Sequence, residues 1–393
     1  MAAMSGGMAA MFGGMAASGN EANMEAVLID VAAGHAQESQ SGLQLLRPRI
    51  WGAFHRVPGK VAAIVIHPTS NFMHHYLLEP LAARGVAALG LNTRYLGSDV
   101  SMLLERAIQD LGAGVRWLHE QGYERVLLIG NSGGAALVSL YQSQAENLDI
   151  AATPAGDPID LRPADLPPAQ GIALTAAHLG RSRLMETWID PAVIDERDPL
   201  STDPALDMFD PANGPPYSRA FLDRYRAEQR IRLARLEIWA RARLRELRGV
   251  RNGIDDMAFV IHRTLADPRC LDPAIDANDR KAGTTVWGPP RAQNFAANSM
   301  GRFTTLTAFL SQWAPCSRGD GQACLARTSV PVLLAEHTAD ASTFPSDHAE
   351  WAAAAGDRLH RRFALKGGNH YLSEQPQLAA QLADEIAAFA AAL

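Results

Sequence analysis

The sequence predicts an α/β fold: a mostly parallel sheet with helices on both faces and a mainly helical insertion. First, short apolar runs alternate with stretches of helical period over residues 24–177 and again over 301–393. Second, this alternation stops over residues 178–300. Third, an apolar run over 126–129 enters a glycine-rich turn and then an Ala- and Leu-rich stretch. Strands separated by helices pair in parallel, so the two flanking segments are expected to share one core.

Residues 24–177 supply most of the predicted sheet. The expected strand at 61–66 is a short apolar run that ends in polar and turn-forming residues, and the stretch 101–121 repeats apolar residues at helical spacing. A helix is also expected directly after the glycine-rich turn. The remaining expected elements are strands at 24–31, 49–55, 61–66, 86–91, 125–129 and 171–176, and helices at 77–84 and 101–121.

The insertion begins near residue 178 and is predicted to be a helical cap. Residues 190–216 are rich in Asp and Pro and indicate irregular loop, whereas residues 221–250 indicate one long helix that contains nine arginines. The favoured interpretation is that these arginines face water; the alternative is that some line a pocket for an anionic substrate. After the insertion we expect helices at 303–313, 348–355 and 375–393, and strands at 330–335 and 362–365.

Composition narrows the functional classes. Of the 393 residues, 47% are hydrophobic and 20% are charged, which is ordinary for a globular enzyme. The net charge of −6 provides no field that would recruit nucleic acid. No apolar run approaches the ~18 residues of a membrane span. Residues 1–23 are rich in Met, Ala and Gly, and their glycines interrupt any apolar core, so we expect a disordered leader and a cytoplasmic location.

The cysteine count argues against a disulfide scaffold and against a zinc site. The three cysteines are too few for the first and wrongly spaced for the second. Cys316 and Cys324 flank a short polar loop, so a bridge between them stays open, although a reduced pair is favoured.

The turn Gly130-Asn131-Ser132-Gly133-Gly134 matches the G-x-S-x-G pattern of a nucleophile elbow. A serine at a sharp strand-to-helix turn projects its hydroxyl above the sheet. The next helix directs its N-terminal dipole and free N–H groups at the same place. The pattern is short, and a tight turn without chemistry would also produce it. The predicted strand before it and helix after it favour a catalytic Ser132.

A serine nucleophile needs a base, and the base needs an orienting acid. Both are expected on loops that follow strands of the sheet. Asp340 follows the strand at 330–335, and His370 follows the strand at 362–365, which gives the chain order Ser, Asp, His. Glu336 and Asp347 compete for the acid role. The histidines that compete with His370 are His67, His74, His75, His178 and His337.

These motifs resemble the α/β-hydrolase superfamily over residues 24–177 and 301–393. Residues 331–340 are similar to the acid turn of that family, and Gly367-Gly368-Asn369-His370 resembles its histidine turn. His67-Pro68 stands where the family commonly has His-Gly ahead of the oxyanion loop. The resemblance implies an oxyanion hole from the Gly133 N–H and one N–H of Thr69 or Ser70. It also implies a cap at 178–300.

The expected function is hydrolysis of a carboxylic ester of small or medium size through an acyl-enzyme on Ser132. The expected substrate is a small molecule with a hydrolysable carbonyl, with no metal, organic cofactor, nucleic acid or membrane span involved. Amide, peptide or carbon–carbon bond hydrolysis on the same triad stays open, as does a non-catalytic receptor or scaffold. The sequence also leaves a homodimer open, and it does not identify the natural substrate.

Overall fold

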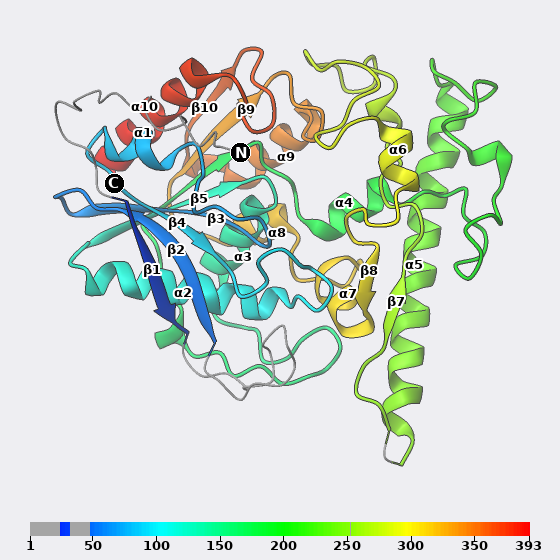
Figure 1. Cartoon of the computed structure of the whole chain (residues 1–393), viewed down its shortest axis with the longest axis horizontal. Helices are drawn as coiled ribbons and strands as arrows, with labels where there is room; N and C mark the ends of the chain where they lie inside the picture. The colour runs from blue at the N-terminus through cyan, green and yellow to red at the C-terminus, as the bar shows by residue number, and fades with distance from the viewer. Residues whose placement is uncertain (1–23, 32–47, 252) are drawn as a thin grey trace, which may run out of the picture.

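The computed structural model describes residues 24–31, 48–251 and 253–393. The predicted leader at 1–23 and the turn between the first two predicted strands lie outside these described residues. Within them, eight strands form one sheet in the order β1-β2-β4-β3-β5-β6-β9-β10 (Figure 1). The strands are β1 (Met24–Asp30), β2 (Arg49–His55), β3 (Val61–His67), β4 (Ala87–Asn92), β5 (Arg125–Asn131), β6 (Gly171–Thr175), β9 (Val332–His337) and β10 (Leu359–Leu365).

The sheet is parallel except at its first edge. β2 pairs antiparallel with both β1 and β4, whereas the other neighbouring strands run parallel. The strands from β3 onward are joined through helices, and β3 lies between β4 and β5. This strand order is that of the α/β-hydrolase fold, so the predicted fold class is confirmed.

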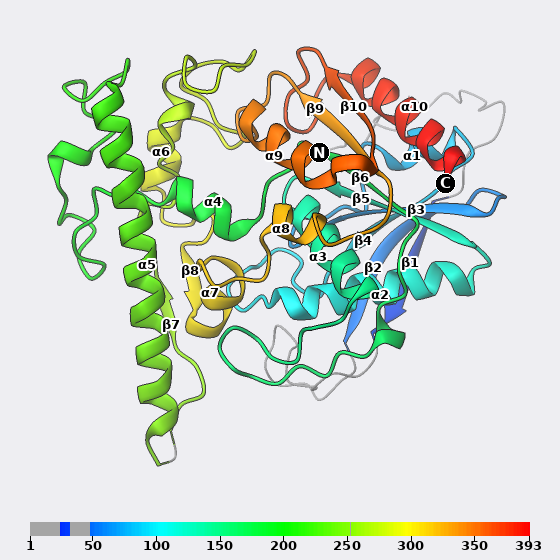
Figure 2. The ribbon, with the colours of Figure 1, turned by 180° about the vertical axis from the view of Figure 1, so that it is seen from behind.

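Helices cover both faces of the sheet, which explains why the central strands read as continuous apolar runs. In β3, Ile64 and Ile66 pack into one core with Leu111 of α2, while Ala63 and Val65 pack into a second core with Leu382 of α10. The first face carries α2 (Leu104–Glu120), α3 (Gly134–Glu146), α8 (Gly321–Leu325) and α9 (Pro345–Ala355), and the second carries α1 (Leu78–Ala82) and α10 (Pro376–Ala392) (Figures 1 and 2).

The segment between β6 and β9 builds a layer beside one edge of this core. The long α5 (Arg219–Gly249) lies farthest from the sheet, with α4 (Arg181–Trp188) and α7 (Leu306–Gln312) between them (Figures 1 and 2). Leu236 and Leu244 of α5 pack with Phe309 of α7 in a separate apolar cluster. The segment also contains α6 (Pro290–Phe295), the paired strands β7 (Ala258–Val260) and β8 (Phe303–Thr305), and short 3-10 turns at Pro204–Leu206 and Pro268–Cys270. Two further 3-10 turns lie outside it, at Pro163–Asp165 and Gly356–Arg358.

Several predicted boundaries need correction. The helix expected at 303–313 begins only at Leu306, because residues 303–305 pair with β7 and the Thr305 hydroxyl accepts from Ala308 N at the start of the helix. The strand expected at 330–335 runs to His337, so Glu336 and His337 are strand residues and not loop residues. Most of the other expected elements shift by one to three residues at their ends.

The arginines of α5 are mostly paired, which differs from the simple picture of arginines in water. Arg232 is only 2% exposed in its side chain and meets Glu196 at 2.6 Å. Arg226 reaches Asp267 at 2.6 Å, and Arg248 reaches Asp157 at 3.0 Å. These arginines therefore bind α5 to neighbouring loops. Ile231 and Ile238 of the same helix are 56% and 70% exposed, so α5 also presents apolar side chains on its outer face.

The three cysteines are free thiols in the structure, so the open alternative of a Cys316–Cys324 bridge is not realised. Burial raises the pKa of each of the three thiols to about 12.

Candidate active site

The glycine-rich turn has the strained backbone of a nucleophile elbow. Ser132 follows β5 directly and has a φ of 57°, in the left-handed region that residues with a side chain rarely adopt. A methyl group on Gly134 would overlap the carbonyl oxygen of Ile66, and one on Gly130 would lie 2.6 Å from the Cα of Ala135. The two glycines are therefore required by the close approach of α3 to β3 and β5.

Ser132, His370 and Asp340 form a connected hydrogen-bonded set. Ser132 Oγ lies 2.9 Å from His370 Nε2, and His370 Nδ1 lies 2.7 Å from Asp340 Oδ2. The three residues are 5%, 4% and 0% exposed, respectively. They come from the loops after β5, β10 and β9, at the carboxyl ends of three parallel strands. The structure thus brings together the three residues that the sequence predicted.

Asp340 is held in the ionised form that an orienting acid requires. Its Oδ1 accepts from the backbone N–H groups of Ser342 and Thr343, and its Oδ2 accepts from the Thr343 hydroxyl. Burial alone would raise the pKa of this carboxyl. The nearby His370 and these hydrogen bonds outweigh burial and hold the pKa well below its ordinary value.

The competing acids serve other contacts. Glu336 accepts from Arg362 Nη2 at 3.0 Å, and Asp347 accepts from Phe344 N at the start of α9. Neither carboxylate hydrogen-bonds to His370.

The competing histidines also have other surroundings. His337 bridges Thr175 Oγ1 and the carbonyl of Asn369, both at 2.8 Å. His178 lies beside the site: its ring centroid is 5.4 Å from that of His370, and its Nε2 is 3.1 Å from Ser342 Oγ. Burial lowers the pKa of His178 to about 3, so its ring is neutral at neutral pH. His75 is buried and His74 is exposed, both on the loop after β3.

The loop after β3 differs from the expected oxyanion loop. The N–H groups of Thr69 and Ser70 donate to His67 Nδ1 over 3.2 and 2.9 Å. Both of the donors that the resemblance offered for the oxyanion are therefore engaged inside the loop. Gly133, the other expected donor, stands at the N-terminus of α3 beside Ser132.

Arg181 is a residue of this region that the sequence interpretation did not identify. Its guanidinium lies 3.0 Å from Asp99 and donates to Gln312 Oε1 and to Thr69 Oγ1 over 2.7 and 3.1 Å. Its side chain is 6% exposed. The available signal was its place six residues after the end of β6 and directly after Gly180, on the segment that leaves the carboxyl end of a parallel strand.

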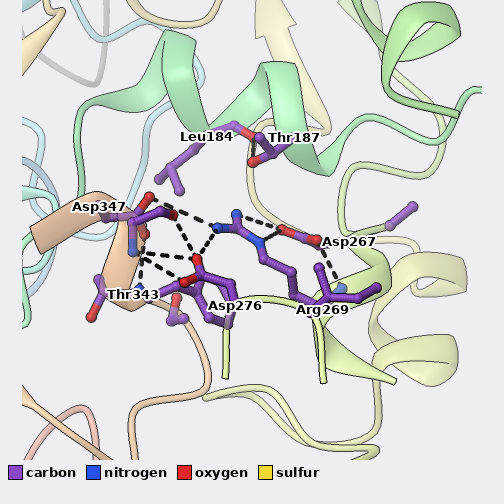
Figure 3. A network of polar contacts seen from close by, with 12 residues as sticks. Leu184, Thr187, Asp267, Arg269, Asp276, Thr343 and Asp347 are labelled. Atoms are coloured by element: carbon purple, nitrogen blue, oxygen red, sulfur yellow. Dashed lines mark hydrogen bonds and ion pairs between the residues drawn. The ribbon is translucent and has the colours of Figure 1, made fainter. Parts of the chain in front are cut away.

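A second arginine joins the inserted segment to the acid loop (Figure 3). Arg269 meets Asp267 at 2.7 Å, Asp276 at 3.5 Å and Asp347 at 3.8 Å. Its guanidinium also lies 3.9 Å from the centroid of the Phe344 ring. Phe344 lies four residues after Asp340 and directly before α9, so Arg269 anchors the start of this helix.

Neither a metal cluster nor a membrane span is seen in the part of the chain that the structure describes. Residues 24–31, 48–251 and 253–393 contain no group of three His, Cys, Asp or Glu side chains that would hold a metal. None of the helices in these ranges is long and apolar enough to cross a bilayer.

A cavity of about 680 Å³ lies between α5 and β7, lined by Trp239, Met257 and Phe259 among others. No member of the Ser132, His370 and Asp340 set lines it. We therefore do not assign it to the substrate of that set.

Comparison with known proteins adds similarities of fold at low sequence identity. Neither a protein-family model nor a curated protein matches the chain. Among solved structures, the esterase domain of a Rhodothermus marinus protein aligns with a TM-score of 0.44 and 14% identity, over 94% of this chain and 98% of that one. A monoacylglycerol lipase from Paleococcus ferrophilus aligns with a TM-score of 0.42 and 14% identity, over 87% and 98%. Est1E from Butyrivibrio proteoclasticus aligns with a TM-score of 0.44 and 11% identity, over 94% and 99%. These scores are low, so the fold assignment rests on the strand order of this chain.

Proposed function

We propose that this protein is a serine hydrolase that cleaves carboxylic esters of small or medium size. The observation that carries the proposal is the chain of contacts from Ser132 Oγ to His370 Nε2 at 2.9 Å and from His370 Nδ1 to Asp340 at 2.7 Å. A hydroxyl within hydrogen-bond reach of a base, and a base oriented by a buried carboxylate, are the requirements of nucleophilic acyl transfer.

In the proposed reaction Ser132 attacks the carbonyl carbon of the ester while His370 Nε2 takes the hydroxyl proton. The carbonyl electron pair moves to oxygen, and the Gly133 N–H stabilises the resulting oxyanion. His370 then gives its proton to the leaving alcohol, which leaves an acyl group on Ser132. Water then attacks the acyl carbon while His370 takes its proton. His370 returns this proton to Ser132 Oγ as the bond between Ser132 and the acyl group breaks, and the acid is released. Asp340 holds the imidazole tautomer throughout and stabilises the imidazolium.

We further propose that residues 178–300 cap this site and contribute to substrate binding. A series of aromatic rings supports this: His178 lies 5.4 Å from His370, Trp188 lies 5.8 Å from His178, and Trp287 lies 5.6 Å from Trp188. Trp188 and Trp287 belong to the inserted segment, so an apolar acyl or alcohol group would bind against them.

The test is a series of p-nitrophenyl esters from acetate to decanoate, measured on the wild type and on Ser132→Ala. We expect turnover with a preferred chain length in the wild type, and a loss of about 10⁴-fold or more in the variant. A circular dichroism spectrum and melting curve like those of the wild type would exclude unfolding as the cause. Full activity of Ser132→Ala would contradict the proposal.

The alternative reactions are separated by a second measurement, covalent labelling with a fluorophosphonate. Labelling of Ser132 without ester turnover would indicate an activated serine with another substrate, and amides and diketones would then be assayed. Neither turnover nor labelling would favour a non-catalytic receptor or scaffold, because such a protein needs no activated serine.

A further inference from the structure

The loop after β3 leaves the proposed oxyanion site short of one donor. Thr69 N and Ser70 N are the two backbone donors of this loop that were expected to bind the oxyanion, and both already donate to His67 Nδ1. An N–H group directed at a ring nitrogen is not aligned with a second acceptor elsewhere. A second donor to the oxyanion must therefore come from another group.

The same two hydrogen bonds define the tautomer of His67. A ring nitrogen that accepts from an N–H carries no proton, so the neutral imidazole has its proton on Nε2. Burial is the largest effect on this ring, followed by the positive charge of Arg181, and together they lower the pKa of His67 well below its ordinary value. His67 is thus neutral at neutral pH, with Nε2 as an N–H donor.

This donor lies beside the nucleophile elbow. A methyl group on Gly133 would be 3.0 Å from His67 Nε2, so the ring edge faces the residue that follows Ser132. His67 is 6% exposed, and Nε2 has no hydrogen-bond partner among residues 48–251 and 253–393. The ring is therefore held from the Nδ1 side, with its N–H free beside Gly133.

We propose that His67 Nε2–H is the second donor of the oxyanion hole, where it acts together with the Gly133 N–H. This inference rests on the proposed acyl transfer at Ser132. When Ser132 Oγ bonds to the carbonyl carbon and its proton moves to His370, the negative oxygen accepts hydrogen bonds from Gly133 N and His67 Nε2. His67 keeps its proton throughout, so it stabilises charge and is neither acid nor base.

The decisive variant is His67→Asn. An asparagine Oδ1 can accept from the N–H groups two and three residues on, as His67 Nδ1 does, so the loop keeps its shape. The amide does not reach the position of Nε2, so the donor beside Gly133 is lost. We expect kcat to fall about 10²-fold with KM changed less than about threefold, because the interaction forms only as the oxyanion develops. His74→Asn, an exposed histidine on the same loop, is the matched control and should keep wild-type kinetics.

A second readout uses a trifluoromethyl ketone, which forms a tetrahedral oxyanion on the nucleophile. Its affinity should fall by the same factor as kcat in His67→Asn. In ¹⁵N-histidine spectra of the wild type, His67 should show the Nε2–H tautomer, and its Nε2 proton should move downfield when the ketone binds. If the wild type is active and His67→Asn keeps the same kcat and ketone affinity, the role of His67 is overturned and the proposed function stands. A wild type that neither turns over esters nor binds the ketone would overturn the proposed function and this inference together.

Discussion

Thr343 donates its hydroxyl to Asp340 Oδ2 over 2.7 Å, and the same oxygen meets His370 Nδ1. Thr343 is fully buried, so no water is expected to replace its hydroxyl. The carboxylate of Asp340 is therefore held by its own loop as well as by His370.

Thr343→Val should destabilise the protein by about 2 kcal/mol, because a buried carboxylate loses a charge-assisted hydrogen bond. The depressed pKa of Asp340 contributes stability that is present above its unfolded value and lost as pH falls through the folded value. Without the Thr343 hydroxyl the folded pKa rises, so acid unfolding should begin at a higher pH. Urea titrations from pH 3 to pH 7 would measure this, and Thr343→Ser, which keeps the hydroxyl, should behave like the wild type. Equal acid sensitivity of the valine and serine variants would contradict the expectation.

Gly134→Ala should abolish activity and lower stability by several kcal/mol, roughly the range of severe steric changes in a packed core. The added methyl group would overlap the Ile66 carbonyl, so α3 must move away from β3 and carry Ser132 with it. Gly249→Ala is the matched control: nothing lies within 4 Å of the added group there, at the last residue of α5. Melting temperature and ester turnover would be measured on both. A stable, active Gly134→Ala protein would show that the elbow tolerates this displacement.

The carboxyl of Asp347 should make stability depend on pH in the opposite direction to Asp340. Burial raises its pKa to about 6, and the negative charges of Asp276 and Asp267 act in the same direction, even though Arg269 acts to lower it. The folded protein then holds a proton that the unfolded chain releases near pH 4, so the free energy of unfolding should fall as pH rises from about 4 to above 6.

This contribution should be roughly 2 kcal/mol, and it should disappear in Asp347→Asn, whose side chain can still accept from Phe344 N. Chemical unfolding of both proteins at pH 4.5 and pH 7.5 would measure it. Other groups titrate in this range, so the comparison between the two proteins is decisive. An identical pH dependence in both would contradict the raised pKa.

Arg181→Gln should cost about 3–5 kcal/mol of stability, because it removes a buried cation and leaves Asp99 without its partner. Arg183→Gln, two residues along the same helix, is the control. Its side chain is 32% exposed, and its pairs with Asp320 and Glu350 are partly solvated, so a loss of about 0–1 kcal/mol is expected. Thermal unfolding would compare the two. Equal losses would show that the burial of Arg181 contributes no extra stability.

Much of the fold and of the candidate site could be predicted because the signals are local. The apolar run before Ser132 and the glycines around it lie within one strand, turn and helix. An apolar run indicates a buried strand, and glycines in a turn indicate close backbone packing, so both can be inferred from a few neighbouring residues. Asp340 and His370 follow predicted strands, and parallel strands bring such loops to one edge of the sheet.

The oxyanion loop and the inserted segment could not be predicted in the same way. Whether Thr69 N points at a substrate or at His67 Nδ1 depends on a side-chain rotation that no spacing encodes. Arg232 belongs to the helix whose arginines were expected to face water, but its side chain is buried. Its guanidinium donates to Glu196 and to the carbonyl groups of Asp190 and His262, which lie 30 or more residues away in sequence.

By itself, then, the sequence determined the α/β-hydrolase fold class and the three residues Ser132, His370 and Asp340 that hydrogen bonds connect. Backbone periodicity, glycine sterics and motif order act over a few residues, so they can be read without coordinates. Tertiary structure decided the partners of the charged side chains: Arg269 among three carboxylates, Arg181 against Thr69, and the His67 ring against Gly133. A hydrogen bond or ion pair depends on distances of a few ångströms between residues distant in sequence, and only the packed chain sets those distances.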